Sequence, residues 1–272
     1  MGQPYAEGVA QRPRLWRVLI LLPPSEGKTQ RRRGRTLDLE TLSFPELTGL
    51  RATIIERASE ISARPDAHRL LGVSPNLVEE VARNTRLHVA ATAPAGEVYS
   101  GVLYDALDLA SLDPGSKRRA NRRIVILSAL FGALRPTDRV PAYRLHPCVE
   151  LPGIGGLTDA WRPVLAPVLE QEAGARRLIV DCRSSTYAAM WNPRGELSER
   201  RVQVTVPGAS HMAKHTRGLV ARHLVQSAAK PRYAEDLAEI LSDAFNVRIT
   251  EPERPGRPWQ LAVAPLPATG RG

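Results

Sequence analysis

Short apolar runs recur along the chain and constrain its fold more than any other feature. Residues 17–22 read RVLILL and end at two prolines, residues 123–128 read RIVILS, and residues 178–182 read LIVDC. Runs this short and uniformly apolar are typical of strands buried on both faces of a sheet. The same pattern predicts further strands at residues 88–92, 202–206 and 260–263.

Helical patterns separate several of these runs and predict helices at residues 48–62, 158–173, 214–229 and 233–245. Strands that alternate with helices favour an α/β (mixed α+β) domain with a mixed β-sheet and surrounding helices. A chain of 272 residues with 43% hydrophobic residues has enough apolar side chains for one large core. We expect a single domain over residues 17–272 after a flexible basic extension at residues 1–16.

Positive charge is clustered in three windows. Residues 116–144 contain eight Lys and Arg against one Asp, residues 200–232 contain seven against no acid, and residues 1–35 contain eight against two Glu. Together these windows carry more net charge than the whole chain, which is +10, so the remainder is acidic. Basic residues placed in this way indicate a phosphate-rich partner.

Several functional classes are disfavoured. Two cysteines, Cys148 and Cys182, are too few for a disulfide framework and lack zinc-binding spacing. His211 and His215 have a metal-pair spacing, but Lys and Arg surround them, so we expect no metal. No run approaches the roughly 20 apolar residues of a membrane span, and the N-terminus lacks a signal-peptide pattern. We expect a cytoplasmic protein without a cofactor or a membrane partner.

The first candidate motif, PPSEGKT at residues 23–29, follows the first predicted strand. A phosphate-binding P-loop needs a Gly five positions before Gly27, where this chain has Leu22. We therefore reject a P-loop ATPase. Lys28 remains a candidate ligand-binding residue, because ligands bind at the carboxyl ends of strands in open α/β sheets. The alternative is an exposed polar turn.

The second motif, GEVYSG, covers residues 96–101. Glu97 and Tyr99 lie two positions apart and would face the same side of an extended segment. A carboxylate beside a phenol is suited to proton transfer, or the two groups simply bond to each other.

The third motif spans residues 128–145, from Ser128 at the end of a predicted strand to the segment PAYRL. Arg135 and Arg144 follow Ser128 on loops bounded by prolines. Arginine forks bind phosphate in a bidentate manner, which favours phosphate recognition. In the alternative interpretation, Arg135 pairs with Asp138 and shapes the loop.

Two later segments add polar groups to the same predicted edge. Asp181 ends the LIVDC run, and a helix that begins at Lys214 would place Arg217 and Gly218 on the face of Lys214. Arg222 follows one turn later in this basic segment.

These segments together resemble the YaaA-type peroxide stress proteins over residues 17–250. The resemblance rests on five motifs in order: Lys28-Thr29, the 96–101 turn, the block from Ser128 through Leu-Arg-Pro to Tyr-Arg-Leu, the Ser184/Tyr187 loop, and Ala213-Lys214 with Arg217-Gly218. It implies a single α/β fold with an inserted helix-hairpin-helix. It also implies cytoplasmic proteins that protect DNA, limit free iron and bind duplex or bent DNA through a basic cleft.

Two stretches fit the hairpin that the resemblance implies, residues 151–155 and residues 65–86. We prefer the second, which predicts a helix, a turn at Gly72, and a helix capped by Ser74 with Pro75 as its first residue. Amides at such a turn would contact phosphate without reading bases. The alternative is an ordinary helix pair.

Two functions therefore stand. In the first, the protein binds DNA phosphates with little sequence specificity through Lys28, Gly72, Arg135, Arg144, Lys214, Arg217 and Arg222. In the second, it is an enzyme acting on a nucleotide or nucleobase-like molecule, with candidate catalytic residues Lys28, Glu97, Tyr99, Ser128, Asp181 and Lys214.

Overall fold

A computed structural model describes residues 18–208 and 210–266. The predicted extension at residues 1–16 lies outside the described residues. The centre of the fold is a seven-stranded mixed sheet in the order β10-β11-β9-β8-β1-β3-β4. Its strands are β1 (Val18–Leu22), β3 (Ile124–Ser128), β4 (Gly132–Leu134), β8 (Leu178–Asp181), β9 (Arg201–Thr205), β10 (Phe245–Thr250) and β11 (Trp259–Pro265).

Five adjacent strands form a parallel core. β1 pairs in parallel with β3 and β8, β8 with β9, and β9 with β11. The edge strands β4 and β10 pair antiparallel with β3 and β11. Every residue of β1, β3 and β8 is buried, because helices cover both faces of the sheet. This double burial explains the uniformly apolar runs and confirms the mixed α/β fold expected from them.

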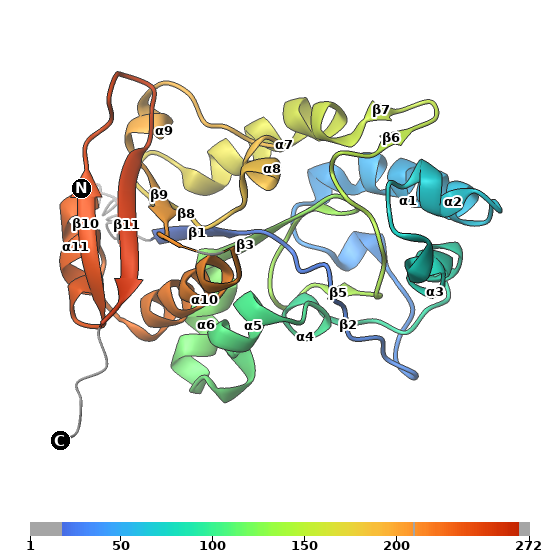
Figure 1. Cartoon of the computed structure of the whole chain (residues 1–272), viewed down its shortest axis with the longest axis horizontal. Coiled ribbons are helices and arrows are strands. Elements are labelled where there is room, and N and C mark those ends of the chain that lie inside the picture. Colours follow the sequence, from blue (N-terminus) through green and yellow to red (C-terminus); the bar gives the residue numbers. More distant parts are fainter. Residues whose placement is uncertain (1–17, 209, 267–272) are drawn as a thin grey trace, which may run out of the picture.

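The helices lie on both sides of this sheet (Figure 1). α5, α6 and α10 lie on one side, α7, α8 and α9 on the other, and α1 to α3 lie at the end of the molecule away from β10 and β11 (Figure 1). The helices are α1 (Thr48–Ser62), α2 (Ala67–Leu70), α3 (Val78–Ala82), α4 (Ala95–Val98), α5 (Val102–Leu107), α6 (Pro114–Arg123), α7 (Leu157–Ala173), α8 (Ser185–Ala188), α9 (Glu196–Glu199), α10 (Ser210–Gln226) and α11 (Ala234–Ser242). Among the described residues, none of these is long and apolar enough to cross a membrane.

Helix α10 packs closely against α5, and Gly218 makes this approach possible. A Cβ atom at position 218 would clash with the carbonyl oxygen of Leu103 and lie 2.8 Å from the Cβ of Ala106. Only a residue without a side chain fits there. The close contact fixes the middle of α10 relative to α5.

The prediction of a strand at residues 88–92 was wrong. Val89 and Ala90 donate main-chain hydrogen bonds back to the carbonyl of Arg86, so this stretch turns. The strand β2 (Ala93–Pro94) begins only afterwards and pairs with β5 (Arg139–Val140) in a separate ribbon. At the C-terminal end, the predicted helix stops at Ser242 and Phe245 opens strand β10.

The predicted hairpin at residues 65–86 contains two short helices, α2 and α3, rather than two long ones. Gly72 turns the chain with φ 62°, and Ser74 accepts a hydrogen bond from the amide of Asn76 at 3.4 Å, with Pro75 next. These details agree with the predicted turn and cap, but they do not establish a helix-hairpin-helix. The competing stretch at residues 151–155 lies in a ribbon of β6 (Glu150–Leu151) and β7 (Gly155–Gly156).

Candidate functional site

The sheet topology creates a crevice at the carboxyl ends of β1 and β8. These strands are neighbours, but the chain after β1 leads to β3 on one side and the chain after β8 leads to β9 on the other. Loops that diverge in this way leave space between them, which is the usual ligand-binding position in open α/β sheets.

A cavity of about 540 Å³ lies at this edge. It brings together segments that are far apart in the sequence, and all five motifs contribute to it. The lining comes from residues 23–28 after β1, 100–104 at the start of α5, 144–146, the loop and helix after β8 at 184–187, and Ala213, Lys214 and Arg217 of α10.

Lys28 lies half-buried in the lining of this cavity. Its Nζ donates hydrogen bonds to the carbonyl oxygens of Ser25 at 2.8 Å and Glu26 at 3.4 Å. The amine lies 4.2 Å from the centroid of the Tyr143 ring and 5.6 Å from that of Tyr99. Burial, reinforced by the charge of Arg144, lowers the pKa of Lys28 to about 7. A large fraction of this amine is therefore uncharged at neutral pH.

Hydrogen bonds between main chains hold the first two motifs together. The amide of Thr29 donates to the carbonyl of Val98 at 2.8 Å, and that of Ser100 donates to the carbonyl of Gly27 at 3.2 Å. Lys28 and Tyr99 thus face each other in a short antiparallel bridge.

A chain of buried hydroxyl groups lies beside Lys28. The hydroxyl of Tyr143 is 2.9 Å from that of Tyr99 and 2.7 Å from Ser128 Oγ, which accepts a hydrogen bond from the amide of Phe131 at 3.0 Å. Burial raises the pKa of Tyr143 to about 12 and raises the pKa of Tyr99 well above its usual value. Both phenols are therefore neutral, and the structure brings three of the candidate residues, Lys28, Tyr99 and Ser128, together.

Three further cations line the cavity: Arg144, Lys214 and Arg217. Arg144 is held by Glu26 at 3.3 Å and Glu80 at 3.4 Å, with 17% of its side chain exposed. Lys214 is exposed. Among the described residues, the Arg217 Nε atom is buried without a hydrogen-bond partner. The side chains of Lys214 and Arg217 come from the first two turns of α10, where the helix dipole adds positive potential.

Glu97 lies away from this group. Residues 95–98 form the short helix α4 rather than an extended segment, so the predicted shared orientation of Glu97 and Tyr99 was wrong. Tyr99 is buried, whereas Glu97 is exposed and forms an ion pair with Arg31 at 2.7 Å.

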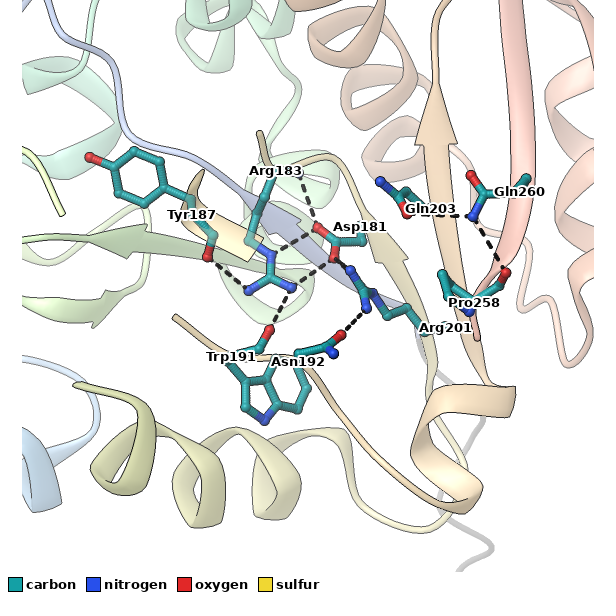
Figure 2. A network of polar contacts seen from close by, with 9 residues as sticks. All are labelled: Asp181, Arg183, Tyr187, Trp191, Asn192, Arg201, Gln203, Pro258 and Gln260. Atoms are coloured by element: carbon teal, nitrogen blue, oxygen red, sulfur yellow. Dashed lines mark hydrogen bonds and ion pairs between the residues drawn. The ribbon is translucent and has the colours of Figure 1, made fainter. Parts of the chain in front are cut away.

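Asp181 lies in a buried ion-pair network (Figure 2). Arg183 donates to both carboxylate oxygens at 2.8 and 2.7 Å, and Arg201 donates at 2.9 Å. Arg183 also binds the carbonyl of Trp191 at 2.9 Å. Burial alone would raise the pKa of Asp181, but Arg183 and then Arg201 outweigh it and lower the pKa to about 2. The carboxylate is permanently ionised and tied to its two arginines.

Two arginines that we predicted to contact phosphate have partners within the protein. Arg135 binds Glu172 at 2.7 Å and the carbonyl of Ile124 at 3.0 Å, whereas its contacts with Asp138 are made by main-chain groups of Arg135. Arg222 donates to the carbonyls of Leu107 and Asp108 at the C-terminal end of α5, at 2.9 and 2.7 Å.

Other arginines of the basic windows behave in the same way. Arg119 donates to the carbonyl of Val225 at 2.7 Å, at the end of α10. Arg200 donates to the carbonyl of Gly174 at 2.8 Å, just after α7. Much of the clustered charge therefore satisfies helix C-termini rather than facing an external partner.

Sequence reasoning missed His146 and the Glu26–Arg144 contact. His146 lines the cavity, and burial lowers its pKa; its position two residues after Arg144 was the available signal. Cys182 is buried, which raises its pKa to about 12, and Cys148 is exposed. Within residues 18–208 and 210–266, no three His, Cys, Asp or Glu side chains gather as a metal site would require.

Comparison with known proteins gives a consistent family. The family model described as peroxide stress protein YaaA matches residues 18–250. A UPF0246 protein of Streptomyces coelicolor is 45% identical over 255 residues, which cover 90% of this chain and 98% of that protein. A UPF0246 protein of Corynebacterium efficiens is 41% identical over 243 residues, covering 86% and 96%. The chain belongs to the peroxide stress protein YaaA (UPF0246) family.

Proposed function

We propose that this protein serves in the peroxide stress response by binding DNA, with the cations of the cavity contacting backbone phosphates. The observation that carries the proposal is the convergence of Lys28, Arg144, Lys214 and Arg217 on one cavity at the carboxyl edge of the sheet. These side chains come from segments that are up to about two hundred residues apart in the sequence, and the fold brings them together.

The unmet hydrogen-bonding capacity of Arg217 supports an anionic ligand. Its Nε atom is buried and finds no acceptor among the described residues. A buried donor without a partner is costly, and an oxygen of a bound phosphate would satisfy it. Arg217 is half-buried and lies one turn after Lys214 in α10. Such a position allows a bound anion to complete the hydrogen bonding of Arg217.

The carboxylate of Glu26 competes only weakly with a phosphate for the guanidinium of Arg144. Glu26, which holds one side of this guanidinium, is 72% exposed. An ion pair this open to water contributes little, roughly 0–1 kcal/mol. A backbone phosphate would therefore displace Glu26 from Arg144 at small cost.

The proposed interface is small, because several arginines of the basic windows already bind partners within the protein. Because Arg135 and Arg222 bind protein carbonyls and Glu172, the cavity offers three cations that stay charged at neutral pH rather than a long basic surface. These three cations are Arg144, Lys214 and Arg217. Phosphate contacts carry no base sequence. We therefore expect binding with little sequence specificity and with a moderate dependence on salt.

Fluorescence anisotropy of a labelled duplex tests the proposal. Lys214→Ala should weaken binding, whereas Lys230→Ala removes another exposed lysine that does not line the cavity and should leave binding unchanged. Glu97→Gln should also leave binding intact. Equal affinity of the wild type and Lys214→Ala would contradict the proposal, as would the absence of duplex binding.

A further inference from the structure

Lys28 differs from the other lysines of the chain. The sequence contains four, Lys28, Lys117, Lys214 and Lys230. The last three are exposed, whereas Lys28 is half-buried in the wall of the cavity. Its hydrogen-bond acceptors are the main-chain carbonyls of Ser25 and Glu26 rather than carboxylates. This environment does not hold the amine in its charged form.

Burial and the charge of Arg144 favour the free amine of Lys28, and they outweigh the opposing effects of Glu80 and Glu26. Two tyrosine rings, with centroids 4.2 and 5.6 Å away, exclude water from one side of Nζ. Arg144 lies close enough to disfavour a second positive charge, and burial together with this charge lowers the pKa of Lys28 to about 7. An uncharged lysine amine is a nucleophile, and carbonyl compounds are its usual reaction partners.

The rest of the cavity selects for anions. Arg144, Lys214 and Arg217 line the same space as Lys28, so an electrophile bearing phosphate would be concentrated beside the amine. We propose that Lys28 is a nucleophilic amine that condenses with an aldehyde carrying phosphate, and that an abasic site in DNA supplies this aldehyde. The choice of DNA as the source rests on the function proposed above.

The reaction is a dehydration without any redox change. The Lys28 nitrogen attacks the aldehyde carbon of the opened deoxyribose and forms a carbinolamine. The carbonyl oxygen then leaves as one water molecule together with the two amine hydrogens, and a carbon–nitrogen double bond remains. Hydrolysis reverses the step, so the protein would hold the damaged site covalently but reversibly.

An abasic site suits this cavity in size and in accessibility. A volume of about 540 Å³ accommodates a deoxyribose with its flanking phosphates. Extrusion of a nucleotide from a duplex is easiest where the base is damaged or missing. The aldehyde of such a site lies next to phosphates, as the juxtaposition of Lys28 with Arg144 and Arg217 requires.

Reductive trapping tests the inference. The full-length protein is incubated with a duplex containing one abasic site and with sodium cyanoborohydride, and covalent protein–DNA product is measured on a denaturing gel and mapped by mass spectrometry. Lys28→Arg keeps a basic side chain but cannot form the imine, and Lys230→Arg is the matched control. We expect trapping at Lys28 that falls by about tenfold or more in Lys28→Arg and is unchanged in Lys230→Arg.

Two further probes distinguish failure of the Lys28 inference from failure of the proposed DNA-binding function. A duplex with a tetrahydrofuran abasic analogue keeps the phosphates but lacks the aldehyde, so its anisotropy reports binding alone. Binding of this duplex without trapping of the abasic duplex at Lys28 overturns abasic DNA as the source; absence of binding to both duplexes overturns the proposed function as well.

Pyridoxal 5′-phosphate with borohydride, compared with pyridoxal, tests the amine without DNA. Labelling of Lys28 that depends on the phosphate supports the reactive amine even where DNA fails, and then assigns a small phosphoaldehyde as the source. Absence of both DNA trapping and labelling at Lys28 overturns the inference entirely.

Discussion

Replacement of Lys28 by methionine should change how the stability of the protein depends on pH. In the folded protein the pKa of Lys28 falls from its usual value near 10.5 to about 7. Between these values the unfolded chain binds a proton that the folded protein does not bind. The free energy of unfolding contributed by this residue therefore rises with pH across this range, by at most about 1.4 kcal/mol per pH unit for one proton.

Methionine has a similar length and does not titrate. Below pH 7 the wild-type protein carries the full cost of a charged, half-buried amine, and a tenfold change in proton affinity corresponds to about 1.4 kcal/mol. We therefore expect the stability of Lys28→Met relative to the wild type to be highest near pH 7 and to fall by a few kcal/mol towards pH 10.5. The variant also removes two hydrogen bonds, which lowers its free energy of unfolding by roughly 1 kcal/mol each at every pH.

Urea unfolding of both proteins at several pH values between 7 and 10 measures this effect. Subtracting the two curves of unfolding free energy against pH removes the contributions of all other titrating groups. Lys230→Met, which replaces an exposed lysine, should run parallel to the wild type. A Lys28→Met curve that also runs parallel to the wild type would refute the assignment of a depressed pKa to Lys28.

Three structural predictions follow from the packing. Asp181→Asn leaves two buried arginines without their carboxylate and should lower the free energy of unfolding in urea by about 3–5 kcal/mol. Gly218→Ala forces α10 away from the carbonyl of Leu103 and should cost about 1–3 kcal/mol, seen as a lower Tm by circular dichroism. Arg222→Met removes hydrogen bonds to the end of α5; it should lower Tm through a loss of about 1–2 kcal/mol, while duplex affinity of the folded protein stays unchanged. A variant as stable as the wild type would contradict the contact it removes, and a large loss of affinity in Arg222→Met would contradict our placement of that side chain outside the interface.

The central strands were predictable because burial on both faces leaves a strong sequence signal. β1, β3 and β8 consist almost wholly of apolar residues. Ser128 and Asp181, the polar residues that we predicted at the ends of two of these strands, are the last residues of β3 and β8. The edge strand β10 alternates buried and exposed residues and follows a helix almost directly. Such an edge strand gives a weak signal, and we extended the helix into it.

The candidate site was predictable as a set of strand ends, but the roles of individual arginines were not. Lys28, Ser128 and Lys214 followed from their positions after strands or on a helix. Arg123 donates to the carbonyl of Leu224, which lies about a hundred residues further along the chain. Such an acceptor is a main-chain group, and no side-chain pattern marks it. In the sequence, basic residues that bind helix C-termini therefore cannot be distinguished from basic residues that bind phosphate.

Glu97 shows a different limit. Its predicted orientation assumed an extended segment, and the turn of helix at residues 95–98 rotated the side chain into solvent. One helical turn is too short to give a periodic pattern. The neighbouring Tyr99 is buried, so the two side chains point to different environments.

The salt dependence of duplex affinity tests the central claim most directly. Measured by anisotropy over a salt series, the logarithm of the association constant should fall with the logarithm of salt concentration with a slope of about −3 for the three cavity cations Arg144, Lys214 and Arg217, since each neutralised phosphate contributes about −0.9. Arg217→Ala and Lys214→Ala should each reduce this slope by about 1, and Lys230→Ala should not. A slope that is unchanged in both cavity variants, or binding that does not respond to salt, would contradict phosphate recognition by this cavity.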